Sequence, residues 1–358
     1  MGIVNLLLLL VIFSSCASSN KKADRVFVKG VYGNPGSLLR AGYFFDSLGM
    51  NAVFVRSISL TPQFYETARQ QGCQVFVEFP TLNGKDYLED HPEAWPINEK
   101  GEQEPAADWF MGICPTHPGF KEHRANQLRN IMDEFDVDGV FLNYLHWHAQ
   151  FETPYPILPE TCFCNRCVRQ FEMYADREVK GEDISQKADW ILTHADKEWR
   201  DWRNSILNGW VQDMKDVVKS HQPEALLGVY YCAWYPENHH EALYRTLGID
   251  VKGLARIADV LSPMLFHKMK DRPPVWVGQY LDWLESQTQA GKKGTPLVWP
   301  IVQAHNSPGI VSPGEFREVM LEGSKYPSSG IMMFSDVSLV EDPEKVEVMR
   351  DLYIHGFK

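Results

Sequence analysis

The chain has 358 residues, of which 44% are hydrophobic and 23% charged, and its formal net charge is −12. This acidic balance, without a basic stripe, argues against a nucleic-acid-binding surface. The length suits one large α/β domain with insertions or two ordinary domains, and the hydrophobic content permits a sizeable core.

The first residues predict an export signal that is not part of the fold. The apolar run Ile3–Phe13 is shorter than the roughly 20 residues that a membrane span requires. It is followed by small residues and Cys16, which resembles a bacterial lipoprotein signal, although no Lys or Arg precedes the run. The resemblance implies a signal peptide over 1–15, lipidation of Cys16, and anchoring to the outer membrane on its periplasmic or cell-surface side. An ordinary signal peptide with a chance cysteine is the alternative.

Residues 16–25 would then form a tether, and 26–358 a single folded domain in which strands and helices alternate. Apolar runs predict eight strands, at Val26–Tyr32, Ala52–Arg56, Gln74–Phe79, Val137–Leu145, Leu226–Trp234, Ala258–Phe266, Thr295–Gln303 and Gly330–Asp336. The segments between them predict helices at Ser37–Leu48, from Pro62, and at Pro118–Phe135, Lys187–Ser220, Glu241–Leu247, Val275–Gln289, Gly314–Ser324 and Pro343–Tyr353.

Eight strands alternating with helices predict an α/β fold of the (βα)8 TIM-barrel type. An open doubly wound sheet is the competing interpretation, but no glycine-rich phosphate-binding loop follows any strand, which favours the barrel. Long polar insertions are expected after strand three, over Leu82–Cys114, and after strand four, over Ala149–Gln186. Spacings of three and four predict a core-facing helical stripe of Trp199, Trp202, Ile206 and Trp210.

Polar and aromatic side chains gather at the predicted strand ends, which in a barrel converge on one mouth. Their mixture is typical of a carbohydrate site, because sugars need side-chain hydrogen bonds and flat apolar faces. The groups expected to hold a sugar are Arg56, Asn143, Tyr144, His146, Tyr230, His267 and Gln303, with Trp147, Trp234 and Trp299 stacking on it.

Hydrolysis of a glycosidic bond usually requires two carboxyl groups. Glu78 and Asp336 are the best placed on strands, and we expect them to be the catalytic pair. Glu152 and Glu237, in loops, are the reserves. An ion pair between Glu78 and Arg56 on the neighbouring strand is the structural alternative; Arg56 could equally bind the carboxylate or sulfate of an acidic sugar.

Three runs resemble glycoside-hydrolase-like (βα)8 families: DVDGVFLNYLHW at 136–147, SPMLFH at 262–267 and VWPIVQA at 298–304. The CFCNRC segment with the following Phe171 resembles an insertion after strand four in the same proteins. The resemblance implies a TIM barrel that hydrolyses a poly- or oligosaccharide. These families carry an aspartate near the end of strand four, where this chain has Asn143. A shifted carboxyl pair, assistance from a substrate group, or a non-catalytic glycan-binding protein would each be compatible with that change.

The cysteines Cys162, Cys164 and Cys167 form a C-x-C-x-x-C motif. Such thiols could hold a structural zinc ion with Cys114, His146 or His148 as fourth ligand, and a disulfide is equally natural outside the cytoplasm. Hydrolysis itself requires no cofactor. A metal-dependent hydrolase or lyase that uses His146 and His148, with Glu152, is a further alternative. The expected partner is a poly- or oligosaccharide, and membrane contact would be through the lipid anchor alone.

Overall fold

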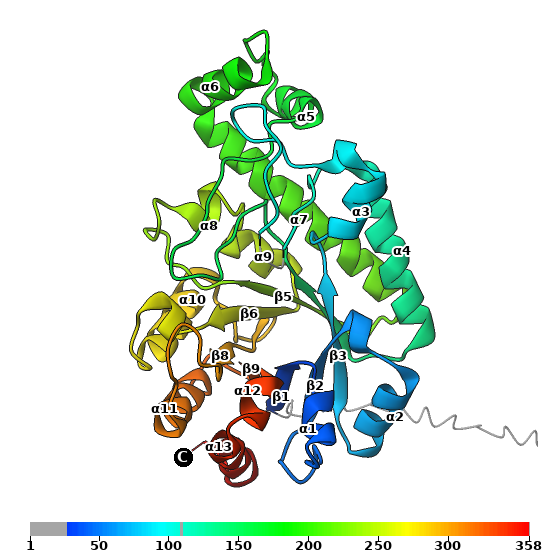
Figure 1. Cartoon of the computed structure of the whole chain (residues 1–358), viewed down its shortest axis with the longest axis vertical. Coiled ribbons are helices and arrows are strands. Elements are labelled where there is room, and N and C mark those ends of the chain that lie inside the picture. The colour runs from blue at the N-terminus through cyan, green and yellow to red at the C-terminus, as the bar shows by residue number, and fades with distance from the viewer. Residues whose placement is uncertain (1–26, 108–109, 358) are drawn as a thin grey trace, which may run out of the picture.

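The computed structural model describes residues 27–107 and 110–357, and its centre is a closed parallel sheet (Figure 1). Neighbouring strands follow the order β5-β4-β3-β2-β1-β9-β8-β6, and pairing of β5 with β6 closes the ring. The strands are β1 (Val28–Gly33), β2 (Ala52–Arg56), β3 (Gln74–Pro80), β4 (Gly139–Asn143), β5 (Leu226–Cys232), β6 (Val260–Leu265), β7 (Leu297–Val298), β8 (Ile301–Gln303) and β9 (Gly330–Phe334).

The segments β7 and β8 both pair with β6 and form one position of the barrel. The interruption between them contains Pro300, which has no N–H to donate to a neighbouring strand. The described residues therefore form an eight-stranded parallel barrel surrounded by helices, and the predicted TIM barrel is confirmed.

Helices follow most strands and cover the outside of the barrel (Figure 1). They are α1 (Gly36–Arg40), α2 (Pro62–Gln70), α3 (Lys85–Asp90), α4 (Pro118–Glu134), α5 (Asn165–Ala175), α6 (Ile184–His194), α7 (Asp196–His221), α8 (Ala242–Arg245), α9 (Val251–Ile257), α10 (Trp276–Thr288), α11 (Pro313–Gly323), α12 (Asp336–Val340) and α13 (Pro343–His355). Short 3₁₀ turns are η1 (Ser57–Ser59), η2 (Pro92–Ala94) and η3 (Lys268–Lys270).

Two predicted helices differ from the structure. The helix expected over Ser37–Leu48 ends at Arg40, because Gly42 takes a left-handed conformation with φ of 88° and turns follow it. The helix expected over Lys187–Ser220 is divided at Ala195 into α6 and α7. The tryptophans of its stripe are buried as predicted, and Ile206 is partly buried.

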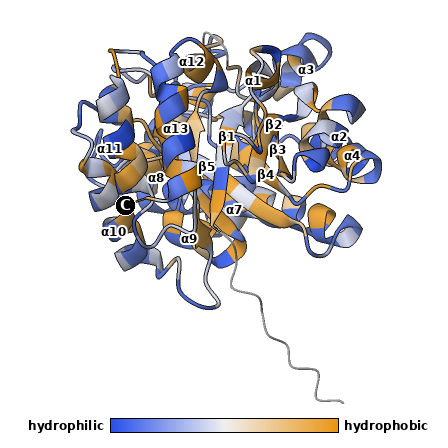
Figure 2. Ribbon diagram, turned by 90° about the horizontal axis from the view of Figure 1, so that it is seen from below, coloured by the Kyte–Doolittle hydropathy of each residue, from blue (hydrophilic) through white to orange (hydrophobic). Residues whose placement is uncertain are grey.

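Aromatic rings fill the interior of the barrel. Phe54 and Phe76 lie with ring centroids 4.9 Å apart, and Phe141 and Trp299 complete the cluster, which is called here the aromatic layer. Gly228 makes room for it, since a Cβ there would lie 2.2 Å from the Phe141 ring. Apolar residues accordingly dominate the strands in Figure 2, while hydrophilic ones are common on the surrounding helices.

The two insertions lie beyond one end of the barrel. Figure 1 shows α3, α5 and α6 there, with α5 and α6 beside the start of the long α7. The predicted signal peptide, the tether and Cys16 lie outside the described residues. Within the described part, no helix has the length and apolar character needed to cross a bilayer.

Candidate functional site

A layer of polar side chains lies at the C-terminal end of the barrel, next to the aromatic layer. Arg56, Glu78 and Asn143 each stand two residues beyond an aromatic residue of that layer, and alternate residues of a strand share a face. The strand register pairs Arg56 directly with Glu78. Because alternate residues of a strand face the same side, three predicted site residues from three neighbouring strands meet at one place.

Glu78 is the centre of this layer. The Asn143 Nδ2 donates to Glu78 Oε1 at 2.7 Å and also contacts the Tyr32 hydroxyl at 2.9 Å. The Arg56 Nε lies 3.7 Å from the other carboxylate oxygen, Oε2, so the ion pair considered from the sequence is present at a long distance. The Glu78 Oε2 has no hydrogen-bond partner among the described residues.

Burial governs the ionisation of Glu78, which is only 4% exposed. Burial raises the pKa of its carboxyl, while the Asn143 hydrogen bond and the charge of Arg56 oppose that rise. A carboxyl whose pKa is raised by burial retains its proton at higher pH than a free carboxyl, which is the property of a general acid.

Glu78 lines a cavity of about 820 Å³ at the ends of β2 and β3, called here the Glu78 cavity. Arg56, Tyr144 and Arg124 of α4 also line it. A space of this size accommodates a small ligand beside the buried carboxyl.

Asp336 lies apart from this cavity. It is the first residue of α12 and is 1% exposed. Its Oδ1 accepts the backbone N–H of Asn34 at 3.0 Å, and its Oδ2 has no hydrogen-bond partner in the described chain. A Cβ at Gly33 would lie 2.7 Å from Oδ1, so glycine is required there for this close contact. Asp336 is thus fixed beside the end of β1, outside the residues that line the Glu78 cavity.

Two further predicted binding residues have structural partners. The amide of Gln303 accepts the Lys268 N–H and donates to the carbonyls of His305 and Ser307, so its hydrogen bonds fix two loops. His267 is fully buried, and its Nε2 lies 3.0 Å from Glu315 Oε1. Neither side chain lines the Glu78 cavity.

The aromatic residues Tyr230 and Tyr144 lie near the polar layer. The Tyr230 ring packs against Tyr32 at 4.9 Å, and burial raises the pKa of its hydroxyl well above the usual range. Tyr144 follows Asn143 in a left-handed conformation with φ of 53° and stacks on Phe110. Of the two, Tyr144 lines the Glu78 cavity.

The histidine pair does not form a metal site with Glu152. His146 Nδ1 lies 2.8 Å from the Trp147 carbonyl, and burial lowers its pKa to about 4. His148 accepts the Gly112 N–H with Nδ1 and contacts the Pro105 carbonyl with Nε2, so both of its ring nitrogens are in use. Among the described residues, the candidate metal cluster is made of cysteines.

The predicted stacking roles of Trp147 and Trp299 do not fit their surroundings. Trp147 is fully buried under the Arg203 guanidinium, 4.8 Å from its ring. Trp299 belongs to the aromatic layer, and its Nε1 donates to Ser329 just before β9, at the opposite end of the barrel. Trp234 is 2% exposed, but it lines a cavity beyond the ends of β5 and β6, so its predicted role stays a prediction. The apolar environment that suits a sugar-binding indole equally suits a core indole, which is why the sequence did not separate them.

We expect Trp147→Ala to destabilise the fold by about 3–5 kcal/mol, as deletion of a fully buried indole usually does. Urea unfolding of this variant would measure the loss. Trp283→Ala on α10 is the control, because Trp283 is partly exposed and should cost less. Unchanged stability together with lost glycan binding would restore the stacking role.

Tyr32 and Tyr155 were not among the predicted site residues. Tyr32 could have been found from its place near the end of the first strand, where its hydroxyl meets the Asn143 amide of the polar layer. Tyr155 lies in the strand-four insertion and is 89% exposed. No periodic pattern marks such a loop residue, so only the structure reveals it.

Four cysteines converge at the insertions. Cys114 joins the predicted Cys162, Cys164 and Cys167, and their sulfurs lie within 4.8 Å of one another. Cys114 Sγ is 3.8 Å from the sulfur of Cys164 and 3.5 Å from that of Cys167. None of the six described cysteines is joined in a disulfide in this structure.

The cluster could hold a metal such as zinc. A tetrahedral zinc ion with Zn–S bonds of about 2.3 Å separates its sulfurs by about 3.8 Å, close to the distances found. The Ile97 N–H donates to Cys162 Sγ at 3.3 Å, and the Thr116 hydroxyl lies 3.2 Å from two of the sulfurs. Such surrounding hydrogen bonds are typical of metal-binding thiolates. Three of these cysteines were predicted as possible metal ligands, and Cys114 was one of the three candidates considered for the fourth position.

Comparisons with known proteins identify the fold. No family model matches the chain, and no curated protein sequence matches it. A β-galactosidase from Marinomonas ef1 has a TM-score of 0.66 at 10% identity, covering 90% of this chain and 58% of its own. The PgaB (BpsB) glycoside hydrolase domain from Bordetella bronchiseptica has a TM-score of 0.64 at 13% identity, covering 89% of this chain and 92% of its own.

The catalytic domain of a β-amylase from Paenibacillus polymyxa has a TM-score of 0.64 at 11% identity, covering 92% of this chain and 99% of its own. The chain shares its fold with TIM-barrel glycoside hydrolases. It spans 58% of the length of the Marinomonas galactosidase. Identities this low establish the fold alone, and the activity has to be argued from the site.

Proposed function

We propose that the protein hydrolyses a glycosidic bond in a poly- or oligosaccharide, with Glu78 protonating the leaving oxygen. The observation that carries the proposal is a buried carboxyl of raised pKa lining a cavity at the C-terminal end of a TIM barrel. Asn143 and Tyr32 orient that carboxyl through the amide. The fold shared with glycoside hydrolases supports the same reaction class. The lipid anchor predicted at Cys16 would hold this activity at a bacterial outer membrane.

The decisive experiment is product release by the purified protein from neutral, amino and acidic polysaccharides, with binding recorded on the same samples. Release of reducing ends by the wild type, and not by Glu78→Gln, would support a glycosidase. Binding without release over long incubation would overturn the proposal in favour of a glycan-binding protein.

The second carboxyl group in the proposal is Asp336. Its side chain lies outside the Glu78 cavity, so a catalytic role requires a substrate that reaches beyond the cavity walls. We expect Asp336→Asn to reduce kcat by about 10²-fold or more if it is the base or nucleophile. Thermal unfolding of the same variant measures the contribution of Asp336 to stability, because its Oδ1 accepts the Asn34 N–H.

An unchanged kcat for Asp336→Asn would remove it from the mechanism. Assistance by a group of the substrate would then be the remaining route for Glu78, as in glycosidases that use an N-acetyl group. Ser338→Ala, a change on the same short helix, controls for disturbance of α12.

The alternative function is binding of a glycan without turnover. The observation that favours it is Asn143, an amide at the end of β4 whose NH2 is directed to Glu78 and Tyr32. An amide can neither protonate a leaving group nor act as an ordinary nucleophile. The product-release experiment separates the two functions directly.

For the four-cysteine cluster we propose a structural zinc ion. It joins Cys114, at the end of the first insertion, to the three cysteines of the second. A site closed by four thiolates leaves no position for substrate or water, which is the arrangement of structural zinc. The ion would brace the two insertions against each other.

A further inference from the structure

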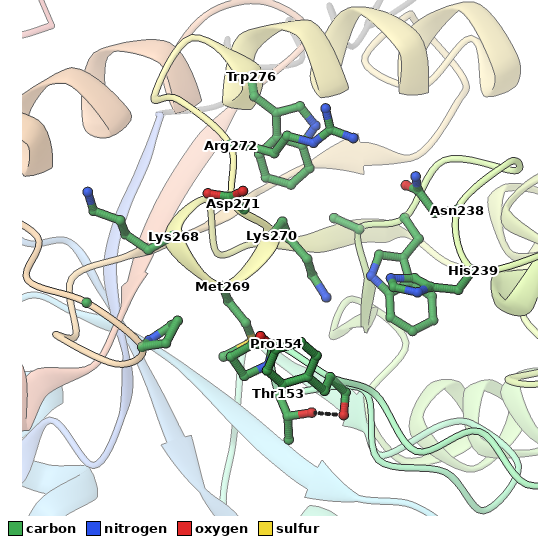
Figure 3. A pocket seen from close by; sticks show the side chains of 15 residues that line it. Thr153, Pro154, Asn238, His239, Lys268, Met269, Lys270, Asp271, Arg272 and Trp276 are labelled. Atoms are coloured by element: carbon green, nitrogen blue, oxygen red, sulfur yellow. Dashed lines mark hydrogen bonds between the residues drawn. The ribbon is translucent and has the colours of Figure 1, made fainter.

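A second cavity lies at the mouth of the barrel, beyond the ends of β5 and β6. Its volume is about 750 Å³, and it is called here the Lys270 cavity. Its walls come from η3 and the residues after it, from the loop after β5 and from the strand-four insertion. Figure 3 shows the Lys270 side chain extending toward His239, with Thr153 and Pro154 on another side.

Positive charge is concentrated in this cavity although the chain as a whole is acidic, with a net charge of −12. Lys268, Lys270 and Arg272 line it, against one lining carboxylate, Asp271. Lys268 is paired with Glu315 at 2.9 Å. Lys270 and Arg272, in contrast, have no direct ion-pair partner among the residues that the structure describes, although the charge of Glu152 reaches the Cys232 thiol beside Lys270. An anion that enters this cavity therefore meets two cations that no direct ion pair holds.

Lys270 is held in place by aromatic rings and not by a carboxylate. Its Nζ lies 4.7 Å from the Trp234 ring and 6.0 Å from the Phe151 ring, and 3.6 Å from Cys232 Sγ. Burial lowers the pKa of His239, and the charge of Lys270 lowers it further. Burial raises the pKa of Cys232 to about 12, so the neighbouring sulfur stays a neutral thiol and does not balance the lysine.

The cavity also offers the groups by which proteins bind sugars. Tyr155 lines it and is 89% exposed, which leaves its ring open to a sugar face. The Asn238 Oδ1 accepts the Tyr235 N–H, and its NH2 remains for a ligand oxygen. His239 and the next two residues take left-handed conformations with φ of 50° to 63°. Non-glycine residues rarely adopt this conformation in succession, and such segments gather at ligand sites.

One loop borders both cavities. Tyr144 lines the Glu78 cavity, and Thr153 lines the Lys270 cavity nine positions later. Between them Phe151 contacts His146, with ring centroids 5.0 Å apart, and its ring lies 6.0 Å from Lys270 Nζ. A sugar chain that occupied both cavities would have to pass this loop.

From these contacts we infer that the Lys270 cavity is a subsite for a sugar residue that carries an oxyanion, a carboxylate or a sulfate. The inference deepens the proposed function and rests on it for the identity of the ligand as a saccharide. Lys270 and Arg272 neutralise the anion, the planar guanidinium of Arg272 suits a two-oxygen group, and Tyr155 packs on the ring. The substrate class is then an acidic poly- or oligosaccharide.

The test is calorimetric binding of three defined probes: an oligogalacturonate, a sulfated galactan oligosaccharide and a neutral galactan oligosaccharide. We expect the wild type to bind at least one acidic probe more tightly than the neutral one. The double variant Lys270→Gln/Arg272→Gln should weaken binding of that probe about tenfold or more, as loss of charge-assisted hydrogen bonds predicts. Added NaCl should weaken the wild type more than the variant.

The control is Lys252→Gln/Arg256→Gln on α9, which removes the same charge from exposed positions outside both cavities. It should bind the acidic probe as the wild type does. Equal affinity of the wild type for acidic and neutral probes, or wild-type affinity in the Lys270 and Arg272 variant, would overturn the inference. Which acidic probe binds distinguishes carboxylate from sulfate.

This experiment separates the subsite from the hydrolysis reaction. Acidic binding that needs Lys270 and Arg272, with no product released, would support the subsite and remove the hydrolase. Hydrolysis of neutral sugars that the double variant leaves unchanged would support the hydrolase and remove the subsite. Thermal unfolding of each variant confirms that a loss of binding is not a loss of fold.

Discussion

Glu78→Gln is expected to lower kcat by about 10²–10⁴-fold, the usual contribution of a general acid, and at the same time to raise the thermal midpoint at neutral pH. Glutamine keeps an oxygen to accept the Asn143 hydrogen bond but has no proton to give to a leaving group. Glutamine is also uncharged, so its burial does not require a charge to be removed from water. Hydrolysis rates and thermal unfolding of the two proteins measure both effects.

The pH dependence of stability follows from the direction of the Glu78 shift. Burial raises the pKa of the folded carboxyl above its unfolded value of about 4.3, so the native state binds the proton more tightly. The stability contributed by this group is fully present below the unfolded pKa and is lost as the pH rises through the folded pKa. The advantage of Glu78→Gln over the wild type should therefore vanish near pH 4 and grow toward neutral pH.

The activity should follow the same titration. A general acid must be protonated, so hydrolysis by the wild type is expected to fall as the pH rises through the folded pKa of Glu78. Glu89→Gln, the same chemical change at an exposed position of α3, serves as the control and should alter neither the rate nor the unfolding midpoint. If Glu78→Gln lowered the midpoint at neutral pH, the carboxylate would be stabilised by Arg56 and not strained by burial.

The fold could be predicted because its information is local. Buried runs such as Gln74–Phe79 are apolar on both faces, and helices alternate with them, which specifies a parallel barrel without long-range knowledge. The alternation of side chains along each strand then extends the prediction of the fold to part of the site. Since Arg56, Glu78 and Asn143 lie at or near the ends of three successive strands, their meeting follows once the strands are known to be neighbours.

The remaining parts of the site depend on how distant segments pack. Asp336 was predicted to end a strand, but β9 ends at Phe334, and Asp336 begins α12 and accepts the backbone N–H of Asn34. The burial of Trp147 is decided by α7, which places Arg203 over its ring. The charged cavity was missed because Lys270 and Tyr155 lie in a turn and a loop more than a hundred residues apart, where no periodicity applies.

Removal of metal is expected to loosen the two insertions and to leave the barrel folded. We expect the purified protein to contain one zinc ion per chain by elemental analysis, and Cys164→Ser to contain less. The thermal midpoint should fall by about 5–10 °C. This estimate rests on a ligand at about 100 times its Kd contributing about 2.7 kcal/mol. In domains of about 150–250 residues, 1 kcal/mol corresponds to about 2–4 °C. Because zinc requires deprotonated thiols, its loss to a chelator should be faster at lower pH.

Cys73→Ser is the matched control, since Cys73 is a buried thiol outside the cluster. It should keep its zinc and its resistance to chelation. Proteolysis would show where the structure opens: cleavage in the metal-free protein is expected between α5 and α6, within the insertion that contains three of the cysteines, and not in the barrel helices. A metal-free protein whose mass is lower by about 2 Da for each pair of cluster cysteines would instead establish disulfides, the alternative that the C-x-C-x-x-C motif left open. In that case a reductant, and not a chelator, would release the insertions.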